Sequence, residues 1–429
     1  EYKKNIIFNK LKLGVDLSKE DQLIGFNFNI DLFQPLIMAI SVVKAELDIN
    51  SDATWCVCID EAEFLSKEHH KILNTYMRSY NELVFKITTM PYRHHTLETL
   101  VGTPVNIGHD FDYLNIDKLG FNTDSQKSKQ PVFEDFAEKL FLKRIKGTQL
   151  DKANASLSSL LGSSLLLDIQ KNISSDDLPI DQIEKYCDEA TINRAKELLI
   201  KDSDLFQSSI ARKLKGTLIL KDAFQKFKGN AAPSIYSGKS LIVRCSDGNP
   251  RRLLRIFNYL FSDKILRNLP FEKISDKEQG MRLKEFSYSE LDSLNFEVDG
   301  KKTFELFNTI GRFFKDRLHT DKIGTATFNS FKFDIEDDET WKCIEKAVDL
   351  GLIYPDFRGV DNANKMPNRK GRFSFAFCLA PYFFLMPRKG DALSLSMIKR
   401  FSSYSSYLRN KNKDNNHMQY KIEFGDLDE

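Results

Sequence analysis

The chain contains the stretch Thr54-Trp55-Cys56-Val57-Cys58-Ile59-Asp60-Glu61-Ala62-Glu63. Its first six residues carry no charge and favour extended backbone, which predicts a strand buried on both faces of a parallel sheet. Asp60 and Glu61 follow at once, at the carboxyl end of that strand, where open α/β sheets bind their ligands. The plain alternative is a strand end with two solvated acids.

The composition describes an ordinary globular protein. The 429 residues are 41% hydrophobic and 29% charged, enough for two or three domains that each have a core. No apolar stretch approaches the roughly 18 residues of a membrane span. The scattered cysteines fit reduced core residues of a cytoplasmic protein, and Cys56-x-Cys58 has no second pair at a zinc-ligand spacing. A net charge of +2 means that any basic surface is local.

A second strand is predicted close to the first. Residues 31–46 have the pattern of a helix, and Ser66 caps another that runs to about Tyr80. Leu83 to Thr89 then forms a strand that Met90-Pro91 ends. Strand, helix and strand make a βαβ unit, so Thr88 and Thr89 lie near Asp60 and Glu61. A hydroxyl there binds a terminal phosphate or the attacking water; its alternative role is to satisfy local backbone.

The next segment offers histidines and one basic helix end. Adjacent residues such as His94 and His95 do not converge on one ion, and neither they nor His109 belong to a metal-ligand motif, so we expect no metal there. Val105 to Leu119 has the pattern of a further strand region. Phe133 to Ile145 is an amphipathic helix with Lys143 and Arg144 at its end.

From about residue 147 helices and Ser- and Leu-rich turns replace strands. Asn249 is an N-cap and Pro250 the first residue of a helix with a wide apolar face. Arg251 then lies in the first turn, where a cation opposes the helix dipole. Binding of phosphate would make that position tolerable, whereas the alternative is a solvated arginine. Arg252 points about 100° away and is the expected control for Arg251.

The stretch Ser237-Gly238-Lys239-Ser240 imitates a phosphate-binding loop. That motif needs a glycine five residues before Gly238, where this chain has Pro233. No other segment matches G-x-x-x-x-G-K-[S/T]. The printed sequence therefore holds no Walker A motif.

The C-terminal third predicts helices followed by a hairpin. Phe304 to Leu318 and Trp341 to Val348 form the helices, Leu352-Ile353-Tyr354 begins a strand, and Arg372 to Phe377 is its partner. Helices and a hairpin resemble a winged helix, whose wing contacts the phosphate backbone of double-stranded DNA. The alternative is a solvated loop. We call the cations of this connection the basic wing: Lys365, Arg369, Lys370 and Arg372.

Three of these pieces together resemble the AAA+ ATPases related to the origin-recognition complex. They are the strand ending in Asp60-Glu61, the strand ending in Thr88-Thr89-Met90-Pro91, and the helix start Gly248-Asn249-Pro250-Arg251. A winged-helix segment follows in the same order. Thr89-Met90-Pro91-Tyr92, Gly108-His109-Asp110-Phe111 and Leu379-Ala380-Pro381-Tyr382 resemble the bacterial, defence-associated branch. The likeness covers residues 50 to 390.

The resemblance implies an α/β P-loop-type (AAA+) core, a helical lid domain and a C-terminal winged helix. We place the core at 1–146, the lid at 147–275, the winged helix at 285–390, and a C-terminal helix with a flexible tail at 391–429. ATP and Mg²⁺ are the implied cofactors. The implied site has Mg²⁺ and Walker B at Asp60, the catalytic glutamate at Glu61, sensor 1 at Thr88 or Thr89, and sensor 2 at Arg251.

The same resemblance implies an oligomer in which one subunit completes the site of another, and Arg144 is the expected arginine finger. The departure from the family is the Walker A loop, which lies upstream of Walker B. Because Glu1-Tyr2-Lys3-Lys4 is neither an initiator methionine nor a signal peptide, we expect the sequence to begin inside a longer protein that carries this loop. The other interpretation is a chain that does not bind ATP in the usual way.

The leading functional hypothesis is a cytoplasmic ATP-driven switch that acts on double-stranded DNA, as a component of a bacterial antiviral defence system. Its partners are further copies of itself or a defence effector protein, and no membrane. Two alternatives stand beside it: a catalytically degenerate scaffold with an ATPase fold, and a sensor whose winged helix contacts protein.

Overall fold

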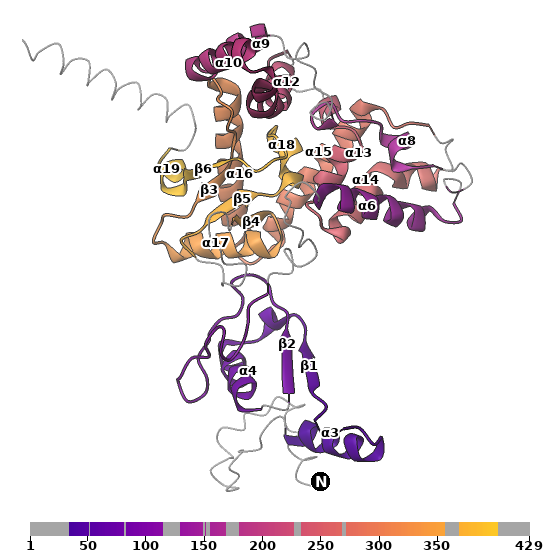
Figure 1. Cartoon of the computed structure of the whole chain (residues 1–429), viewed down its shortest axis with the longest axis vertical. Helices are drawn as coiled ribbons and strands as arrows, with labels where there is room; N and C mark the ends of the chain where they lie inside the picture. The colour runs from indigo at the N-terminus through magenta and orange to yellow at the C-terminus, as the bar shows by residue number, and fades with distance from the viewer. Residues whose placement is uncertain are drawn as a thin grey trace, which may run out of the picture. The chain divides into compact units, whose positions relative to one another are not determined.

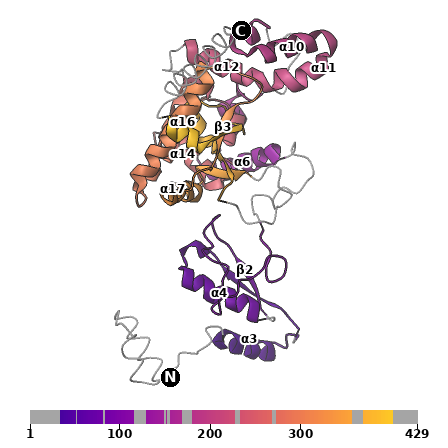
Figure 2. The same cartoon turned by 90° about the vertical axis from the view of Figure 1, so that its left-hand side faces the viewer.

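The computed structural model describes residues 34–50, 52–80, 83–114, 129–148, 151, 155–168, 180–226, 233–267, 272–356 and 369–401. These residues divide into two compact units: residues 1–89 with 93–111, and residues 90–92 with 112–429. The predicted core ended at residue 146, whereas α6 (Lys129–Ile145) belongs to the second unit. Each unit is described by itself (Figures 1 and 2).

The first unit contains the predicted βαβ arrangement. Strands β1 (Trp55–Ile59) and β2 (Leu83–Ile87) are parallel, in a register that pairs Ile59 with Ile87. Helix α4 (Lys67–Ser79) connects them, and its N-cap Ser66 accepts a hydrogen bond from the His69 amide at 3.2 Å. Figure 1 shows the two strands side by side next to α4. Because the strands are in register, the residues after Ile59 and Ile87 lie at one edge of the sheet.

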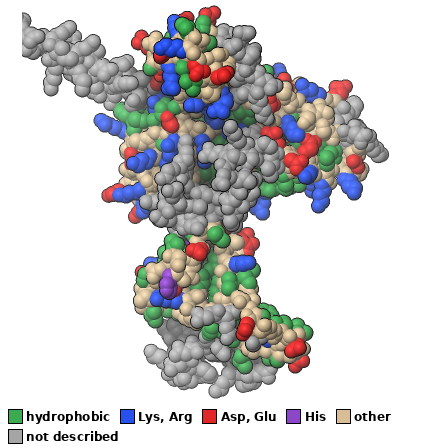
Figure 3. All heavy atoms as spheres, viewed as in Figure 1, with side chains coloured by type: hydrophobic (Ala, Val, Ile, Leu, Met, Phe, Trp, Pro, Cys, Tyr) green, Lys and Arg blue, Asp and Glu red, His purple; other side chains and the backbone are tan. Residues whose placement is uncertain are grey.

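The first unit also has more exposed apolar surface than the sequence predicted. Residues of β1 alternate between half-buried and exposed, so the expected burial on both faces is wrong for the described structure, in which β1 pairs with β2 alone. Helix α3 (Gln34–Glu46) buries Ile40, yet Met38 and Val42 are exposed. Figure 3 shows hydrophobic side chains gathered on this helix. Apolar residues therefore surround α3 instead of forming one stripe.

The predicted strand over 105–119 is wrong in its described part, 105–114. Gly108, at φ +80°, allows a tight turn in which its amide donates to the Phe111 carbonyl at 2.8 Å. The Asp110 carboxylate closes this turn by accepting from the Asn106 amide at 2.8 Å. Side chain to backbone bonds of this kind satisfy the backbone locally and compete with strand pairing.

The second unit begins with helices that enclose one apolar core. In chain order they are α6, α8 (Leu157–Leu161), α9 (Ile180–Tyr186), α10 (Glu189–Lys201), α11 (Ser203–Phe206), the π-helical turn η5 (Gln207–Ala211), α12 (Arg212–Lys226), η6 (Pro233–Ile235), α13 (Lys239–Arg244), α14 (Pro250–Leu266), α15 (Asp276–Asp292), η7 (Ser293–Phe296) and α16 (Gly300–Thr320). Both views show α10 and α12 together at one end of this unit.

One close approach in this helical region explains why Gly238 is a glycine. A Cβ at Gly238 would lie 2.4 Å from the Ser164 amide nitrogen, and its φ of +93° also disfavours other residues. Its amide donates to the Gln279 side chain of α15 at 2.9 Å, and Gln279 in turn donates to the carbonyls of Leu161 and Ile274. The Ser237–Ser240 stretch thus serves packing, as expected for a false phosphate loop.

The C-terminal part of the second unit is a four-stranded sheet with helices on it. The strand order is β4-β5-β3-β6, from β3 (Phe328–Lys332), β4 (Ile353–Asp356), β5 (Arg372–Phe375) and β6 (Asp391–Ser394). The antiparallel pairing of β4 with β5 confirms the predicted hairpin. Phe331 and Phe375 of the sheet lie 6.3 and 6.0 Å, ring centre to ring centre, from Phe307 of α16. The remaining elements are α17 (Asp338–Asp349), η8 (Phe377–Leu379), α18 (Ala380–Phe383) and α19 (Leu395–Arg400).

A winged helix stays a prediction for this part. A helix-turn-helix joins two helices by a short turn. Here β3 separates α16 from α17, and α17 is the single helix between β3 and β4, a stretch that the structure describes throughout. Across the described ranges, we find no helix with the length and apolar character needed to traverse a bilayer.

Candidate functional site

Asp60 and Glu61 form a turn that crosses from the end of β1 to the end of β2. The Thr88 amide donates to the Ile59 carbonyl at 2.9 Å, and the Ala62 amide donates to the Thr88 carbonyl at 2.9 Å. These bonds continue the β1–β2 ladder beyond both strands. The sheet therefore fixes the backbone positions of Asp60 and Glu61, from which the two carboxylates project.

The Thr88 side chain is the part of β2 that meets the carboxylates. Its hydroxyl donates to Asp60 Oδ1, and the Glu61 amide donates both to that oxygen at 3.0 Å and to Thr88 Oγ1 at 3.3 Å. Of the two threonines predicted here, Thr88 is the one that bonds Asp60. Thr89 is the next residue, half-buried. The sequence predicted this neighbourhood but not which hydroxyl would fill it.

Glu61 adopts a left-handed conformation, with φ 54° and ψ 44°. A residue with a Cβ pays about 1–3 kcal/mol for such a backbone, which persists only where surrounding contacts determine it. Here the contacts are the two bonds of the Glu61 amide. The turn leaves the side chains of Asp60 and Glu61 exposed at the sheet edge.

This donor set fits Mg²⁺ better than a transition metal. Mg²⁺ takes oxygen ligands, keeps several waters, and is held by one or two carboxylates together with substrate phosphates. Asp60 and the Thr88 hydroxyl offer oxygen only, at an open edge. Within the portion of the chain described here, no three His, Cys, Asp or Glu residues are grouped so as to hold a metal ion.

Two histidines that follow β2, His94 and His95, lie beside His70 of α4. The ring centre of buried His70 lies 4.4 Å from that of His94 and 5.3 Å from that of His95. His94 Nε2 is 3.0 Å from the Asn74 side-chain oxygen. Burial lowers the pKa of His94 to about 4, so this ring is neutral at pH 7. His109 instead lies 3.3 Å from Asp110.

The two predicted phosphate-binding arginines both lie in the second unit, on exposed helix ends. Arg251 is in the first turn of α14, after the N-cap Asn249, whose side chain accepts from the Arg252 amide at 3.1 Å. Arg144 is in the last turn of α6, where a cation complements the helix dipole. The site roles of both arginines stay predictions.

Comparison with protein families decides the group. A family model described as ORC-CDC6-like matches residues 1–395. The chain belongs to the ORC-CDC6-like family. This family lies within the AAA+ ATPases, so an AAA+ α/β core and a nucleotide-driven activity follow from membership. Searches of the curated proteins and of the solved structures return no match.

For an ORC-CDC6-like protein the basic wing has unexpected neighbours. Arg369 Nη2 lies 2.5 Å from Asp338, and Lys370 Nζ lies 3.3 Å from Glu336. These acids belong to a segment that we call the acidic segment, Asp334 to Glu339. Arg372 is half-buried and donates to the Gly390 carbonyl at 2.6 Å. Lys365 lies outside the described residues. Some charge of the wing is therefore balanced within the chain.

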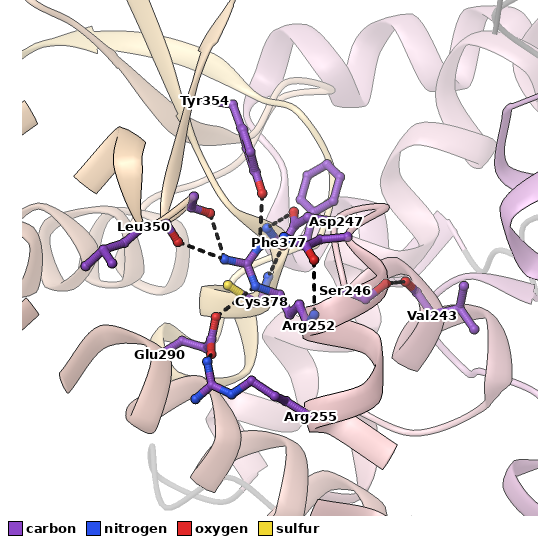
Figure 4. A network of polar contacts seen from close by, with 12 residues as sticks. Val243, Ser246, Asp247, Arg252, Arg255, Glu290, Leu350, Tyr354, Phe377 and Cys378 are labelled. Atoms are coloured by element: carbon purple, nitrogen blue, oxygen red, sulfur yellow. Dashed lines mark hydrogen bonds and ion pairs between the residues drawn. The ribbon is translucent and has the colours of Figure 1, made fainter. Parts of the chain in front are cut away.

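The sequence missed a buried charge network next to Arg251. Arg252, the expected control, is 4% exposed and pairs with Asp247 at 3.1 Å and Glu290 at 2.8 Å (Figure 4). Arg252 is therefore not a neutral control for Arg251, because it takes part in buried ion pairs of its own. The signal was present, because Arg252 falls on the same stripe of α14 as the buried Ile256 and Leu260.

Proposed function

We propose that this ORC-CDC6-like protein is an ATP-driven switch that acts on double-stranded DNA. The observation that carries the proposal is the junction of Asp60, Glu61 and Thr88 at the carboxyl ends of two parallel strands. Parallel α/β sheets bind ligands at this edge. Family membership supports ATP as that ligand.

Each residue of the junction has a proposed task. Asp60 would hold Mg²⁺, with its carboxylate oriented by the Thr88 hydroxyl that donates to it. Thr88 is also the proposed phosphate sensor, a role in which its hydroxyl donates to the phosphate instead of to Asp60. Glu61 accepts a proton from the attacking water, and its side chain is exposed at the sheet edge. Bound Mg²⁺ supplies positive charge that offsets the phosphate oxygens. Thr89 is the alternative phosphate sensor.

Two exposed arginines complete the proposed reaction. Arg251 donates planar, charge-assisted hydrogen bonds to a phosphate, which lysine does not reproduce. Arg144 is proposed as the finger that reaches the nucleotide of a neighbouring copy. This assignment implies a homo-oligomer, in keeping with the AAA+ group.

DNA is the proposed target of the basic wing, through phosphate contacts. Membership of the family supports DNA as a partner. A place in bacterial antiviral defence, with an effector protein as partner, rests on the motif around Thr89 to Tyr92, on Gly108 to Phe111 and on Leu379 to Tyr382.

One observation favours a second candidate function, a scaffold or sensor without hydrolysis that contacts protein. The acidic segment leads into the first turn of α17, and its Asp338 and Glu336 pair with Arg369 and Lys370. The carboxylates of the acidic segment repel a phosphate backbone and suit a basic protein partner.

The proposal is tested by binding of a fluorescent ATP analogue to the full-length protein with and without Mg²⁺. Asp60→Asn keeps the size of the side chain but removes its charge, so we expect the Mg²⁺-dependent gain in affinity to fall at least tenfold. Glu68→Asn, at an exposed acid of the same unit, is the control. An unchanged Mg²⁺ effect in Asp60→Asn contradicts the assignment and favours the scaffold.

A further inference from the structure

The buried network around Arg252 uses every donor of one guanidinium. Nε donates to Glu290 at 2.8 Å. Nη1 donates to Asp247 at 3.1 Å and to the Tyr354 hydroxyl at 2.9 Å. Nη2 donates to the carbonyls of Leu350 at 3.3 Å and Gly351 at 2.9 Å. Since an arginine has five N–H donors, none is left without an acceptor.

These acceptors come from elements that are far apart in the sequence. Glu290 lies in α15, Leu350 and Gly351 follow the last turn of α17, and Tyr354 is in β4. Figure 4 shows the side chains converging on the Arg252 guanidinium from separate segments. The cation also meets the C-terminal end of a helix, where a positive charge is favoured. Arg252 therefore ties α14 to the sheet that carries the β4–β5 hairpin.

Asp247 anchors the turn before α14 through a second set of hydrogen bonds. Its carboxylate accepts from the Phe377 amide at 2.6 Å and from the Cys378 amide at 3.1 Å, at the start of η8 and just after β5. Asp247 and Gly248 both have left-handed backbone, at φ +57° and +74°. This sharp turn leads directly into Asn249, the N-cap of α14.

Arg251 lies between two anchored residues, Asp247 and Arg252. Asp247 precedes it by four residues and Arg252 follows it directly, and the side chains of both are buried while Arg251 is exposed. A displacement of the Arg251 backbone must therefore either move the β4–β5 hairpin or break buried charge-assisted hydrogen bonds. Breaking them removes the buried partner that the Asp247 and Glu290 carboxylates share, which is costly even though Glu290 keeps its ion pair with Arg255.

We propose that Arg252 is a positioning residue that joins Arg251 rigidly to the β4–β5 hairpin and so transmits the state of the nucleotide to the basic wing. The inference rests on the proposed role of Arg251 as phosphate sensor. Arg252 itself contacts no nucleotide in this account. If the network only stabilised the core, substitutions of Arg251 and of the network residues would affect ATP turnover independently.

The rigid connection between Arg251 and the β4–β5 hairpin is tested first without nucleotide, by hydrogen–deuterium exchange of the full-length protein. Tyr354→Phe removes one acceptor and keeps the fold, and Arg252→Lys keeps the charge but loses the fork. We expect exchange to rise together in residues 246–251 and 372–378, about threefold in Tyr354→Phe and at least tenfold in Arg252→Lys. Tyr288→Phe, whose hydroxyl lies outside the network, is the control. A rise in exchange in one segment alone would contradict the rigid connection.

Transmission is tested by a double-mutant cycle on ATP turnover. We expect Arg251→Ala to lower kcat at least tenfold, Tyr354→Phe to lower it two- to fivefold, and the double variant to match Arg251→Ala within twofold. Independent effects that multiply in the double variant overturn the inference, although Arg251 remains a sensor. Wild-type turnover in Arg251→Ala instead removes the sensor role itself, which separates failure of the proposed function from failure of the inference.

Discussion

Replacement of Thr88 by Val tests the candidate site at its most specific contact. Val has nearly the shape of Thr but lacks the hydroxyl, which donates to Asp60 and accepts from the Glu61 amide. A hydrogen bond to a charged group contributes about 1.5–3 kcal/mol when buried, and the exposed setting of Thr88 reduces this to about 1 kcal/mol because water replaces the hydroxyl. A change of that size is about fivefold in an equilibrium or rate constant.

We expect Thr88→Val to lower kcat for ATP about fivefold or more, because Asp60 loses its fixed orientation and Glu61 loses one of two bonds that hold its left-handed turn. Thr89→Val is the matched control and should change kcat by less. Thr88→Ser restores the hydroxyl and should restore most of the turnover. Steady-state phosphate release measures all three variants, with thermal unfolding as the check on the fold.

The opposite ranking would refute this reasoning. If Thr89→Val loses turnover and Thr88→Val does not, the hydroxyl that meets Asp60 in the described structure has no part in the reaction. Equal losses in Thr88→Val and Thr88→Ser would show that the side chain acts by packing and not by its hydrogen bonds.

Two further predictions concern the second unit. Burial lowers the pKa of His319 to about 3, beside Phe224, Lys221 and Lys315, so the unfolded chain binds a proton below pH 6.5 and the folded chain does not. Acidification from pH 6.5 to 5 should therefore lower the free energy of unfolding by up to about 2 kcal/mol. The urea midpoint of His319→Gln should fall less steeply with pH than that of the wild type, and equal slopes in the two proteins would contradict this. Replacing the whole basic wing by Ala should weaken duplex binding and reduce the slope of log K against log salt by about 0.9 for each phosphate that the wing no longer neutralises, whereas an unchanged slope would favour the protein-contact alternative.

Local patterns were sufficient to predict much of the fold. Ser66 and Asn249 are caps whose side chains bond amides three residues on, so the helix starts that they mark depend on nearby residues alone. The apolar run before Asp60 predicted β1, and the parallel pairing followed from strand, helix and strand in succession. These features need no knowledge of distant contacts.

Distant contacts account for what the sequence did not predict. The burial of Arg252 depends on Glu290 and Tyr354, and a charged residue is assigned to the surface unless such partners are known. The pairing of Arg369 with Asp338 joins residues on either side of β4. The selection of Thr88 over Thr89 depends on the register between β1 and β2.

Turnover of ATP by Glu61→Gln tests the central claim most directly. The amide keeps the shape of Glu61 but cannot accept a proton from water, so the full-length variant should bind ATP with near wild-type affinity and release phosphate at least a hundredfold more slowly. Glu68→Gln, an exposed substitution in the first turn of α4, should keep wild-type turnover. Phosphate release by Glu61→Gln at the wild-type rate would contradict the account.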